Sequence, residues 1–397
     1  MKQLLRAMYV TVALLFTSII GGCDPIPPLH LREEIDIDVK FPKVVLDFDV
    51  VWNYDLLYEF GYDTVYDWRK EWRYGWDETD SLLFGPIGYT LPEDFNIRRY
   101  YLGHDTLAKH TTVLRDQIHG HSFTSSYNFG YYDFLVYNEI ESRDVAQSIV
   151  IDEETTLDSI TAYTNETNYG TRYHSTRAYA YNQPEELFAA EKKKVYISKN
   201  IEDYDYYDEA YDTYYKYIDM QLNPVVYIYL TQVIIHHNWG KVVGTDGNAN
   251  LSNFAYSTTL NTGIAGNDPV AVHYNTRLKQ NVYDTQRNEE VDIVGGRLTT
   301  FGIRGINPFD YRYHLQIPEQ IRNQRHYMDV NLIFGNGNDS TLYFDVTDQV
   351  IRRFRGGVIT VELDMDTIRS PGRNGGSGFD AVVQEWVDET HEFDVKD

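Results

Sequence analysis

The chain has 397 residues, a formal net charge of −25 at pH 7 and a single cysteine. So negative a balance excludes nucleic-acid binding, because nothing in the chain could neutralise a run of phosphates. One cysteine allows neither an intrachain disulfide nor a thiolate metal cluster, and the length suggests two domains of ordinary size.

The first 22 residues have the layout of a secretory signal peptide, in which a basic start is followed by an apolar run. Lys2 and Arg6 are the basic residues, and residues 7–22 carry no charge. This run is shorter than the roughly 20 apolar residues of a membrane-spanning helix. It ends in "IIGGC", which resembles the lipobox of bacterial lipoproteins. The sequence therefore favours cleavage after Gly22 and attachment of palmitate-type acyl chains to Cys23, with a plain secretory signal as the alternative.

Alternating strands dominate the rest of the chain. After a proline-containing spacer over residues 23–33, "IDIDVKF" and "VVLDFDVVW" alternate apolar and acidic side chains with the period of a half-buried strand. Further alternating runs begin at residues 131, 328, 340 and 357, and the run after Pro224 is apolar on both faces, as in a strand buried between layers. Many short strands separated by turn residues predict an all-β chain of antiparallel sandwiches.

One segment has helical character. In "QPEELFAAEKKK", Pro184 stands where a helix starts, and acidic residues precede basic ones in the order that the helix dipole favours. The polar stretch over 162–184 predicts a long loop or an edge hairpin. We therefore place a domain boundary here, with one β-sandwich over 34–184 and a second over 185–397.

Histidines offer the first candidate for a metal site. His104, His110, His119 and His121 fall within one short stretch, and "HGH" would place two of them on the same face of a strand. A polar hairpin with solvated histidines is the alternative and is favoured, because no carboxylate or cysteine stands at ligand spacing. His236 and His237 are expected to point to opposite faces.

Other motifs give equally little support for catalysis. Asp246, Asn248 and Asn250 alternate like the start of a calcium loop, but Leu251 stands where such a loop needs glycine, so a turn is expected. The chain holds no Gly-x-Ser-x-Gly elbow, phosphate-binding loop or His-Glu-x-x-His motif. An acidic glycosidase stays open, although no carboxylate pair is singled out. We predict no catalytic residue, no cofactor and no metal ligand.

Aromatic residues are abundant, with 35 tyrosines, and have two interpretations. Seven of them crowd the acidic segment from Tyr204 to Tyr217 and could stack on sugar rings or form a protein interface. Trp68, Trp72 and Trp76 are spaced four residues apart, which favours the buried face of a short helical insert.

Several motifs together resemble the fimbrillin-related lipoproteins of Bacteroidales. These are the lipobox cysteine, the alternating first strand, and, in chain order, "YYDFLVYN", "LNPVVYIYLTQV", "LYFDVTDQV", "GGVITVEL" and "GFDAVVQEW". The superfamily includes shaft pilins and fimbrial anchor subunits. The resemblance implies two tandem transthyretin-like Greek-key β-sandwiches and assembly of pilin-like subunits by strand exchange.

The resemblance also separates two kinds of subunit. Shaft pilins lose an N-terminal strand to an arginine-directed protease, and the candidate sites for such a cut here are Arg69, Arg73, Arg98, Arg99 and Arg115. None has a distinctive context, so an uncut anchor or accessory subunit is favoured. The C-terminal segment "HEFDVKD" is interpreted as an ordinary last strand, with pairing to a neighbouring subunit as the alternative.

The sequence thus predicts a non-enzymatic, lipid-anchored protein of the cell outer membrane that acts as a fimbrial anchor or accessory subunit. The alternative is a surface glycan-binding lipoprotein that uses an aromatic platform. Placement at the cell surface or fimbrium is preferred. A periplasm-facing position is the alternative, because "DPIPPLHLREE" lacks the dense acidic run of a surface-export signal.

Overall fold

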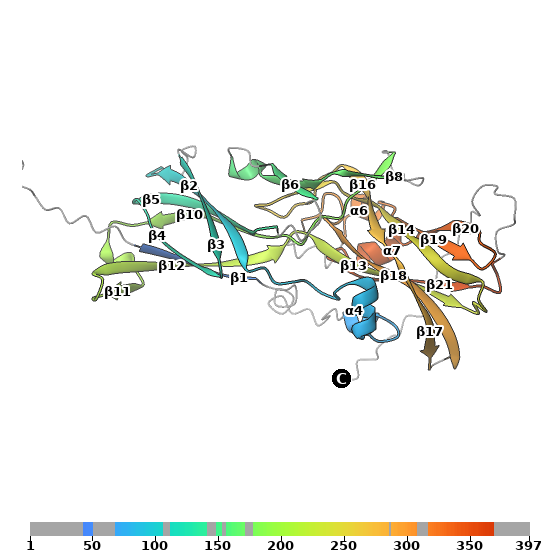
Figure 1. Cartoon of the computed structure of the whole chain (residues 1–397). Helices are drawn as coiled ribbons and strands as arrows, with labels where there is room; N and C mark the ends of the chain where they lie inside the picture. Colours follow the sequence, from blue (N-terminus) through green and yellow to red (C-terminus); the bar gives the residue numbers. More distant parts are fainter. Residues whose placement is uncertain are drawn as a thin grey trace, which may run out of the picture.

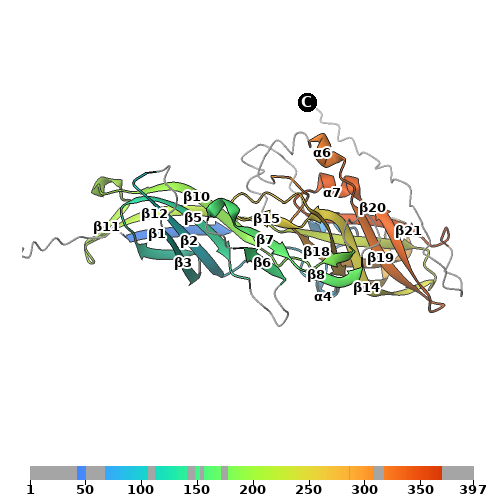
Figure 2. The same ribbon diagram turned by 90° about the horizontal axis from the view of Figure 1, so that it is seen from above.

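The computed structural model describes residues 43–50, 68–105, 112–140, 148–152, 156–170, 178–285, 287–307 and 317–368; for 43–50 it describes the backbone only. The chain is mainly β and forms an elongated molecule of two lobes placed end to end (Figures 1 and 2). Within the described residues, none of the helices combines the length and the apolar character needed to cross a membrane. The predicted all-β fold class is confirmed.

The first lobe consists of one eight-stranded sheet that folds into two layers. Its order is β3-β2-β5-β10-β12-β1-β4, with β11 added beside β12. Its strands are β1 (Lys43–Val50), β2 (Asp94–Gly103), β3 (Thr112–His119), β4 (Ser122–Ser126), β5 (Gly130–Asn138), β10 (Phe188–Ile197), β11 (Tyr206–Asp208) and β12 (Thr213–Pro224).

The corner between the two layers is the short pairing of β10 with β12. Only Phe188↔Pro224 and Ala189↔Asn223 are in register there, so the strands diverge and the sheet turns back on itself. Side chains from both layers, among them Phe95, Phe134 and Met220, meet in one apolar cluster. Burial of this surface is the main force that holds the sandwich together.

The second lobe is a sandwich of two further sheets, a four-stranded one in the order β17-β18-β13-β21 and a six-stranded one in the order β20-β19-β14-β16-β9-β8. Its strands are β8 (Glu166–Gly170), β9 (Tyr179–Tyr181), β13 (Tyr227–His236), β14 (Val242–Ala255), β16 (Pro269–Asn275), β17 (Arg277–Asp284), β18 (Glu289–Thr300), β19 (Tyr327–Phe334), β20 (Asp339–Asp345) and β21 (Gly357–Asp364).

Strand β13 is buried along its whole length, as its two-sided apolar sequence predicts. Tyr229, Val233 and Ile235 face the other sheet of the second lobe, whereas Ile228 and Leu230 belong to the cluster that continues into the first lobe. The cores of the two lobes are therefore joined through one strand.

A small third sheet, in the order β15-β7-β6, lies between the lobes. Its strands are β6 (Ile149–Asp152), β7 (Thr161–Thr164) and β15 (Ser257–Thr259). Leu157, Ile160 and Ala162 from this region pack with Leu135 and Tyr137 of β5 in a separate apolar cluster. Strand β5 is consequently covered on both faces.

The division between sheets does not fall at residue 185. Strands β10 and β12, which follow that residue, complete the first lobe, and the hairpin β8–β9, which precedes it, forms the edge of a sheet in the second lobe. The main change of lobe occurs between Pro224 and Tyr227. The edge hairpin itself is one of the two structures predicted for 162–184.

The predicted helix at "QPEELFAAEKKK" is wrong. Residues 188–197 form β10, which pairs with β5 in the antiparallel sense from Ala189↔Tyr137 to Ile197↔Gly130. Leu187 and Phe188 are fully buried, and that burial outweighs the local helical preference.

Four short α-helices complete the described chain: α3 (Trp68–Glu71), α4 (Glu78–Phe84), α6 (Glu319–Arg322) and α7 (Thr347–Arg352), with 3₁₀ turns at Leu157–Ser159 and Ile201–Asp203. Helices α3 and α4 belong to residues 68–91, which we call the connecting segment. It stands between β1 and β2 in the sequence, both of which lie in the first lobe, yet α4 packs beside β17 and β18 of the second lobe (Figure 1).

Candidate functional site

Strand β1 is the feature of the first lobe that bears most directly on assembly. It pairs in parallel with β12 from Lys43↔Tyr215 to Val50↔Leu222, and antiparallel with β4 from Lys43↔Ser126 to Asp47↔Ser122. It is thus an internal strand of its layer. Its removal would leave unpaired backbone groups on both neighbours, a template for another extended strand.

Four of the five arginines considered as cleavage sites lie in helices or strands, and the fifth lies in a turn. Arg98 and Arg99 lie in β2 with exposed fractions of 7% and 6%. The Arg98 Nη2 atom donates to the Tyr137 hydroxyl at 2.7 Å, and Arg99 donates to both carboxylate oxygens of Asp116 at 2.8 and 3.1 Å. A protease needs an accessible, locally extended segment, which a central strand does not offer.

The other three candidates are also held by secondary structure or by a partner. Arg115 lies in β3, in register with Arg98, and Arg69 lies in α3, although its side chain is outside the described residues. Arg73, in the turn after α3, forms an ion pair with Glu362 of β21.

The tyrosine-rich segment forms a hairpin from β11 and β12 at the end of the first lobe (Figure 1). Exposed fractions are 52% for Tyr206, 39% for Tyr207, 75% for Tyr211 and 44% for Tyr217. The rings of Tyr207 and Tyr214 lie across the hairpin with centroids 4.5 Å apart. Aromatic rings therefore cover an accessible surface here.

The tryptophans of the connecting segment are structural, as predicted. Trp68 and Trp72 are buried, and the Trp72 ring contacts Trp76 edge to face at a centroid distance of 4.9 Å and Phe84 at 5.3 Å. The helix itself covers only 68–71, so Trp76 reaches this cluster from the turn that follows.

Three histidines of the group lie in the described residues, and these three do not converge. Strand β3 ends at His119, Gly120 has a φ of 88°, and β4 begins at Ser122, so the expected placement of His119 and His121 on one face of a strand is wrong. A turn separates them: His119 Nδ1 lies 3.0 Å from Asp94 Oδ1, while His121 packs edge to face on Phe95. The hydrogen bond with Asp94 raises the pKa of His119. His104 is exposed, and His110 lies outside the described residues.

The calcium-like stretch is a bulge within β14, consistent with the expected turn. The pairing of β14 with β19 shifts between Thr245 and Ala249, and Gly247 has a φ of 87°. Asn248 donates its backbone N–H to Asp246, and Asn250 donates its backbone and side-chain N–H groups to Asp329, both at 2.9 Å. These polar groups are used by the fold.

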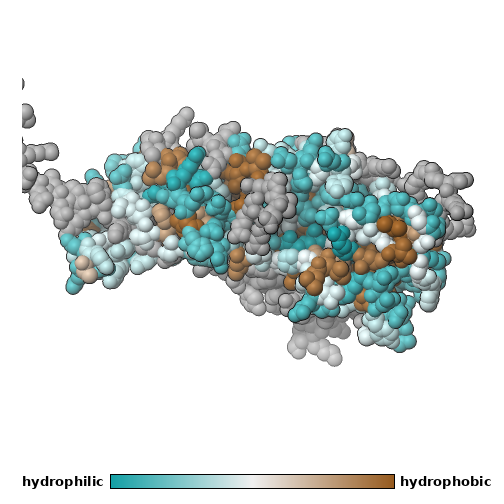
Figure 3. All heavy atoms as spheres, in the orientation of Figure 1, coloured by the Kyte–Doolittle hydropathy of each residue, from teal (hydrophilic) through white to brown (hydrophobic). Residues whose placement is uncertain are grey.

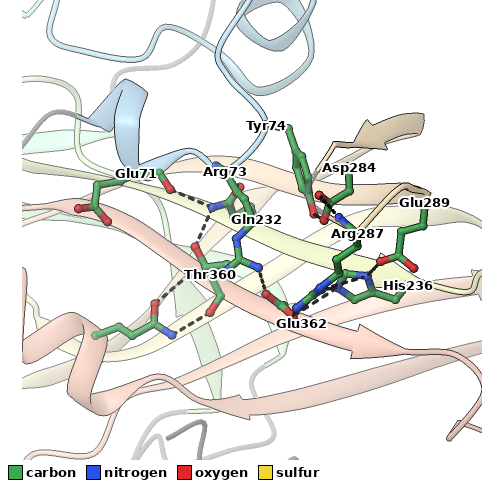
Figure 4. A network of polar contacts seen from close by, with 11 residues as sticks. Glu71, Arg73, Tyr74, Gln232, His236, Asp284, Arg287, Glu289, Thr360 and Glu362 are labelled. Atoms are coloured by element: carbon green, nitrogen blue, oxygen red, sulfur yellow. Dashed lines mark hydrogen bonds and ion pairs between the residues drawn. The ribbon is translucent and has the colours of Figure 1, made fainter. Parts of the chain in front are cut away.

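A polar network that sequence patterns did not reveal joins the connecting segment to the four-stranded sheet (Figure 4). Gln232 of β13 donates to the Glu71 carbonyl at 3.2 Å and to Thr360 of β21 at 2.7 Å. Tyr74 donates to Asp284 of β17 at 3.1 Å, and burial together with this carboxylate raises the pKa of Tyr74 to about 12. These contacts join residues that are 128 to 210 positions apart in the sequence, so no local motif indicates this set.

Charged side chains extend the network toward the end of β13. His236 Nδ1 lies 2.6 Å from Glu289, and Arg287 lies between His236 Nε2, at 2.8 Å, and Glu362, at 3.2 Å (Figure 4). Each charge therefore faces an opposite charge or a hydrogen-bond partner. This arrangement fastens strands together, since truncation of one member would leave a half-buried charge unpaired.

His236 and His237 share a partner, contrary to the expectation that they point apart. His237 Nε2 lies 3.3 Å from Glu289, and its Nδ1 lies 2.9 Å from Asp364. The reason is that β13 ends at His236 and His237 has a φ of 49°, so the chain turns between them. The hydrogen bond from His237 lowers the pKa of Asp364, and the same contact raises that of His237.

His237, Asp364 and Asp366 place side-chain ligand atoms within 4.8 Å of one another, the one such group found among the described residues. Both ring nitrogens of His237 already face carboxylates. A neutral imidazole nitrogen with a free lone pair is what a metal would need. The geometry accordingly favours an ion-pair cluster.

A cleft of about 320 Å³ lies where the connecting segment crosses β17 and β18; Pro86, Asn275 and Arg277 are among its lining residues. Arg297, also in its wall, donates to the Pro86 carbonyl at 3.0 Å and pairs with Glu186.

The molecular face drawn in Figure 3 is largely hydrophilic, with separate hydrophobic patches in both lobes.

Cys23 and Gly22, the predicted lipid-attachment and cleavage residues, lie outside the described residues, as does the C-terminal segment after residue 368. Lipid attachment therefore stays a prediction from the sequence.

No protein-family model matches this chain, and no curated protein matches its sequence. Its fold is similar to several solved structures. One is a "putative adhesin" from Bacteroides ovatus, with 13% identity, coverage of 84% of this chain and 96% of that chain, and a TM-score of 0.46. A second "putative adhesin", from Bacteroides thetaiotaomicron, has 9% identity, coverage of 82% and 93%, and a TM-score of 0.41.

The fimbrial anchor protein Mfa2 from Porphyromonas gingivalis is a third, with 11% identity, coverage of 81% and 90%, and a TM-score of 0.38. The likeness is one of fold alone.

Proposed function

We propose that this protein is a lipid-anchored fimbrial anchor or accessory subunit of the cell envelope, without catalytic activity. The observation that carries the proposal is the place of β1. The first described strand after the lipobox is bonded to β12 on one side and to β4 on the other. The backbone hydrogen bonds of β1 to both neighbours therefore resist a force applied to the N-terminal end of the chain.

The arginine environments support an uncut subunit. Arg98 and Arg99 are buried in β2 and hydrogen-bonded to Tyr137 and Asp116. Loss of a strand by arginine-directed cleavage is thus disfavoured at these positions. In the proposed protein, β1 stays in place and links the first lobe to the acylated Cys23.

Anchoring is tested by replacement of the lipid-attachment residue. We expect Cys23→Ser to move the protein from the outer-membrane fraction to the soluble fraction, and mass spectrometry of the wild type to show an acylated N-terminal Cys23 with Gly22 removed. A wild-type chain recovered soluble and unacylated would remove the lipoprotein part of the proposal. Surface digestion of intact cells then distinguishes a surface position from a periplasm-facing one.

The subunit role is tested by partners. Crosslinking on intact cells should recover pilin-like subunits together with the wild-type protein. A peptide with the sequence of a partner's strand is expected to bind only at a sheet edge that no other strand occupies. With β1 in place, the terminal strands of the described sheet, β3 and β4, are the edges at which a strand of a partner subunit would pair. Recovery of no pilin-like subunit would contradict the proposal.

A second candidate function is glycan binding through the tyrosine hairpin. Tyr206, Tyr207, Tyr211 and Tyr217 are exposed together on β11, β12 and the turn between them. Aromatic faces of this kind stack on sugar rings. A glycan array followed by titration of Tyr211→Ala tests it: binding that weakens with this substitution favours glycan recognition at the hairpin.

A further inference from the structure

The turn after β13 carries a tryptophan in an unfavourable position. Trp239 has an exposed fraction of 79% and a φ of 46°, and His237, two residues earlier, has a φ of 49°. Non-glycine residues adopt left-handed backbone rarely, and bulky ones most rarely. Exposure and backbone strain both act against a tryptophan here. The fold itself does not explain this side chain, which suggests a role toward a ligand.

The Trp239 ring stands beside an imidazole that is held in place. The planes of the Trp239 and His237 rings differ by 19°, and their centroids lie 6.2 Å apart. His237 is fixed from two sides, by Asp364 at 2.9 Å and by Glu289 at 3.3 Å. The two aromatic faces are therefore nearly parallel and share a defined orientation.

Charged side chains lie around the His237 ring. The side chains of Asp364 and Asp366 are 44% and 59% exposed, and Lys241 donates to the Met365 carbonyl at 2.5 Å and lies 3.6 Å from Asp366. The centre of a protein interface is typically depleted of charged residues. An exposed aromatic face with charged side chains nearby suits a small ligand that has an apolar face and many hydroxyl groups.

The chemistry that fits both features is that of a sugar ring. Its C–H face packs against an aromatic face, and its hydroxyl groups donate to carboxylates and accept from an ammonium group. The net charge of −25 and the two carboxylates disfavour an acidic sugar.

We propose that Trp239, with His237, Asp364 and Asp366, forms a binding subsite for a neutral hexose unit of a glycan. Strand β13 begins beside the first lobe and runs away from it, and β21 is parallel to it, so the subsite lies at the far end of the second lobe (Figure 1). The tyrosine hairpin lies at the opposite end of the molecule. The subsite rests neither on that hairpin nor on the fimbrial role.

The test is a titration of the purified mature chain with maltohexaose, mannohexaose, galactohexaose and the hexamer of N-acetylglucosamine. Binding is followed by calorimetry and by the indole N–H resonances of the chain, whose Trp239 signal is assigned from Trp239→Ala. We expect at least one oligosaccharide to bind saturably and to shift the Trp239 resonance. The affinity should fall at least tenfold in Trp239→Ala, fall less in Asp364→Asn, and recover in part in Trp239→Tyr.

Tyr211→Ala is the matched control, since it removes another exposed ring at the other end of the molecule and should leave this binding unchanged. Circular dichroism and the melting temperature verify that each variant folds. Absence of binding by all four oligosaccharides, or binding that Trp239→Ala leaves unchanged, would overturn the proposal. Binding lost in Tyr211→Ala alone would assign glycan recognition to the tyrosine hairpin and would also overturn it. Loss of a protein partner in Trp239→Ala, without sugar binding, would assign the turn to a protein interface instead.

Discussion

The two lobes are both β-sandwiches, but they bury ionisable groups in different ways. In the first lobe, Arg99 of β2 pairs with Asp116 and lies over the rings of Tyr127 and Phe123, at 4.9 and 5.6 Å from their centroids. In the second lobe, His326 is fully buried, and burial lowers its pKa to about 4, so it is neutral at pH 7. Arg99 has a carboxylate that compensates for its lost hydration, whereas His326 has none and loses its charge.

The largest expected effect is on the buried ion pair of the first lobe. Arg99→Ala leaves the Asp116 carboxylate, 23% exposed, without its bidentate partner and removes two cation–π contacts. We expect a loss of about 3 kcal/mol in the free energy of unfolding, measured by urea denaturation. Arg115→Ala, at an exposed position of the adjacent strand, is the control and should cost about 0.5 kcal/mol or less. Equal losses in the two variants would show that the pair is not what holds β2 to β3.

The second lobe should respond to acid through His326. Its Nδ1–H donates to the Ser252 carbonyl at 3.0 Å, and its ring packs on Phe254. Because the folded pKa is below the ordinary value of 6.5, the unfolded chain takes up the proton first. Stability therefore falls as the pH drops from about 6.5 to about 4, by on the order of 3 kcal/mol in total.

This acid response is measured as the urea midpoint against pH in the wild type and in His326→Asn, which keeps an N–H donor. The slope between pH 6.5 and 4 should become shallower in the variant. His119→Asn is the control, because the pKa of His119 is raised by Asp94 and its contribution has the opposite sign. An unchanged slope in His326→Asn would mean that other groups cause the acid response.

A smaller effect is expected where the connecting segment packs on the four-stranded sheet of the second lobe. A Cβ atom at Gly295 of β18 would lie 2.9 Å from the Thr231 carbonyl oxygen and 3.1 Å from the rings of Trp72 and Phe84. Gly295→Ala should therefore push the connecting segment off the sheet and cost about 2 kcal/mol. At Gly244, the nearest atom would be Ile333 Cδ1 at 3.8 Å, so Gly244→Ala is a matched control with little loss. Thermal unfolding of both variants decides whether close approach of the segment matters.

The smallest effect is expected at the tyrosine hairpin. Tyr211 is 75% exposed, and Tyr211→Ala should change the free energy of unfolding by no more than about 0.5 kcal/mol. A larger loss, in the same denaturation assay, would mean that the hairpin contributes to the first lobe's stability and is not only an exposed surface.

Local pattern predicted much of the fold correctly. The alternation in residues 131–137, 328–334 and 357–363 corresponds to β5, β19 and β21, and the two-sided apolar run after Pro224 corresponds to β13. The spacing of Trp68 and Trp72 predicted their burial. These features follow from period and hydrophobicity, which act over a few residues.

Sequence by itself determined the all-β class and the net charge of −25. Tertiary structure decided the rest. It made residues 188–197 a strand, placed β8 and β9 in a sheet of the second lobe, and brought Arg73, Gln232 and Glu362 together. It also placed Trp239 on a strained, exposed turn. The physical reason is that burial and pairing act between residues far apart in the chain, whereas local sequence constrains only neighbouring residues.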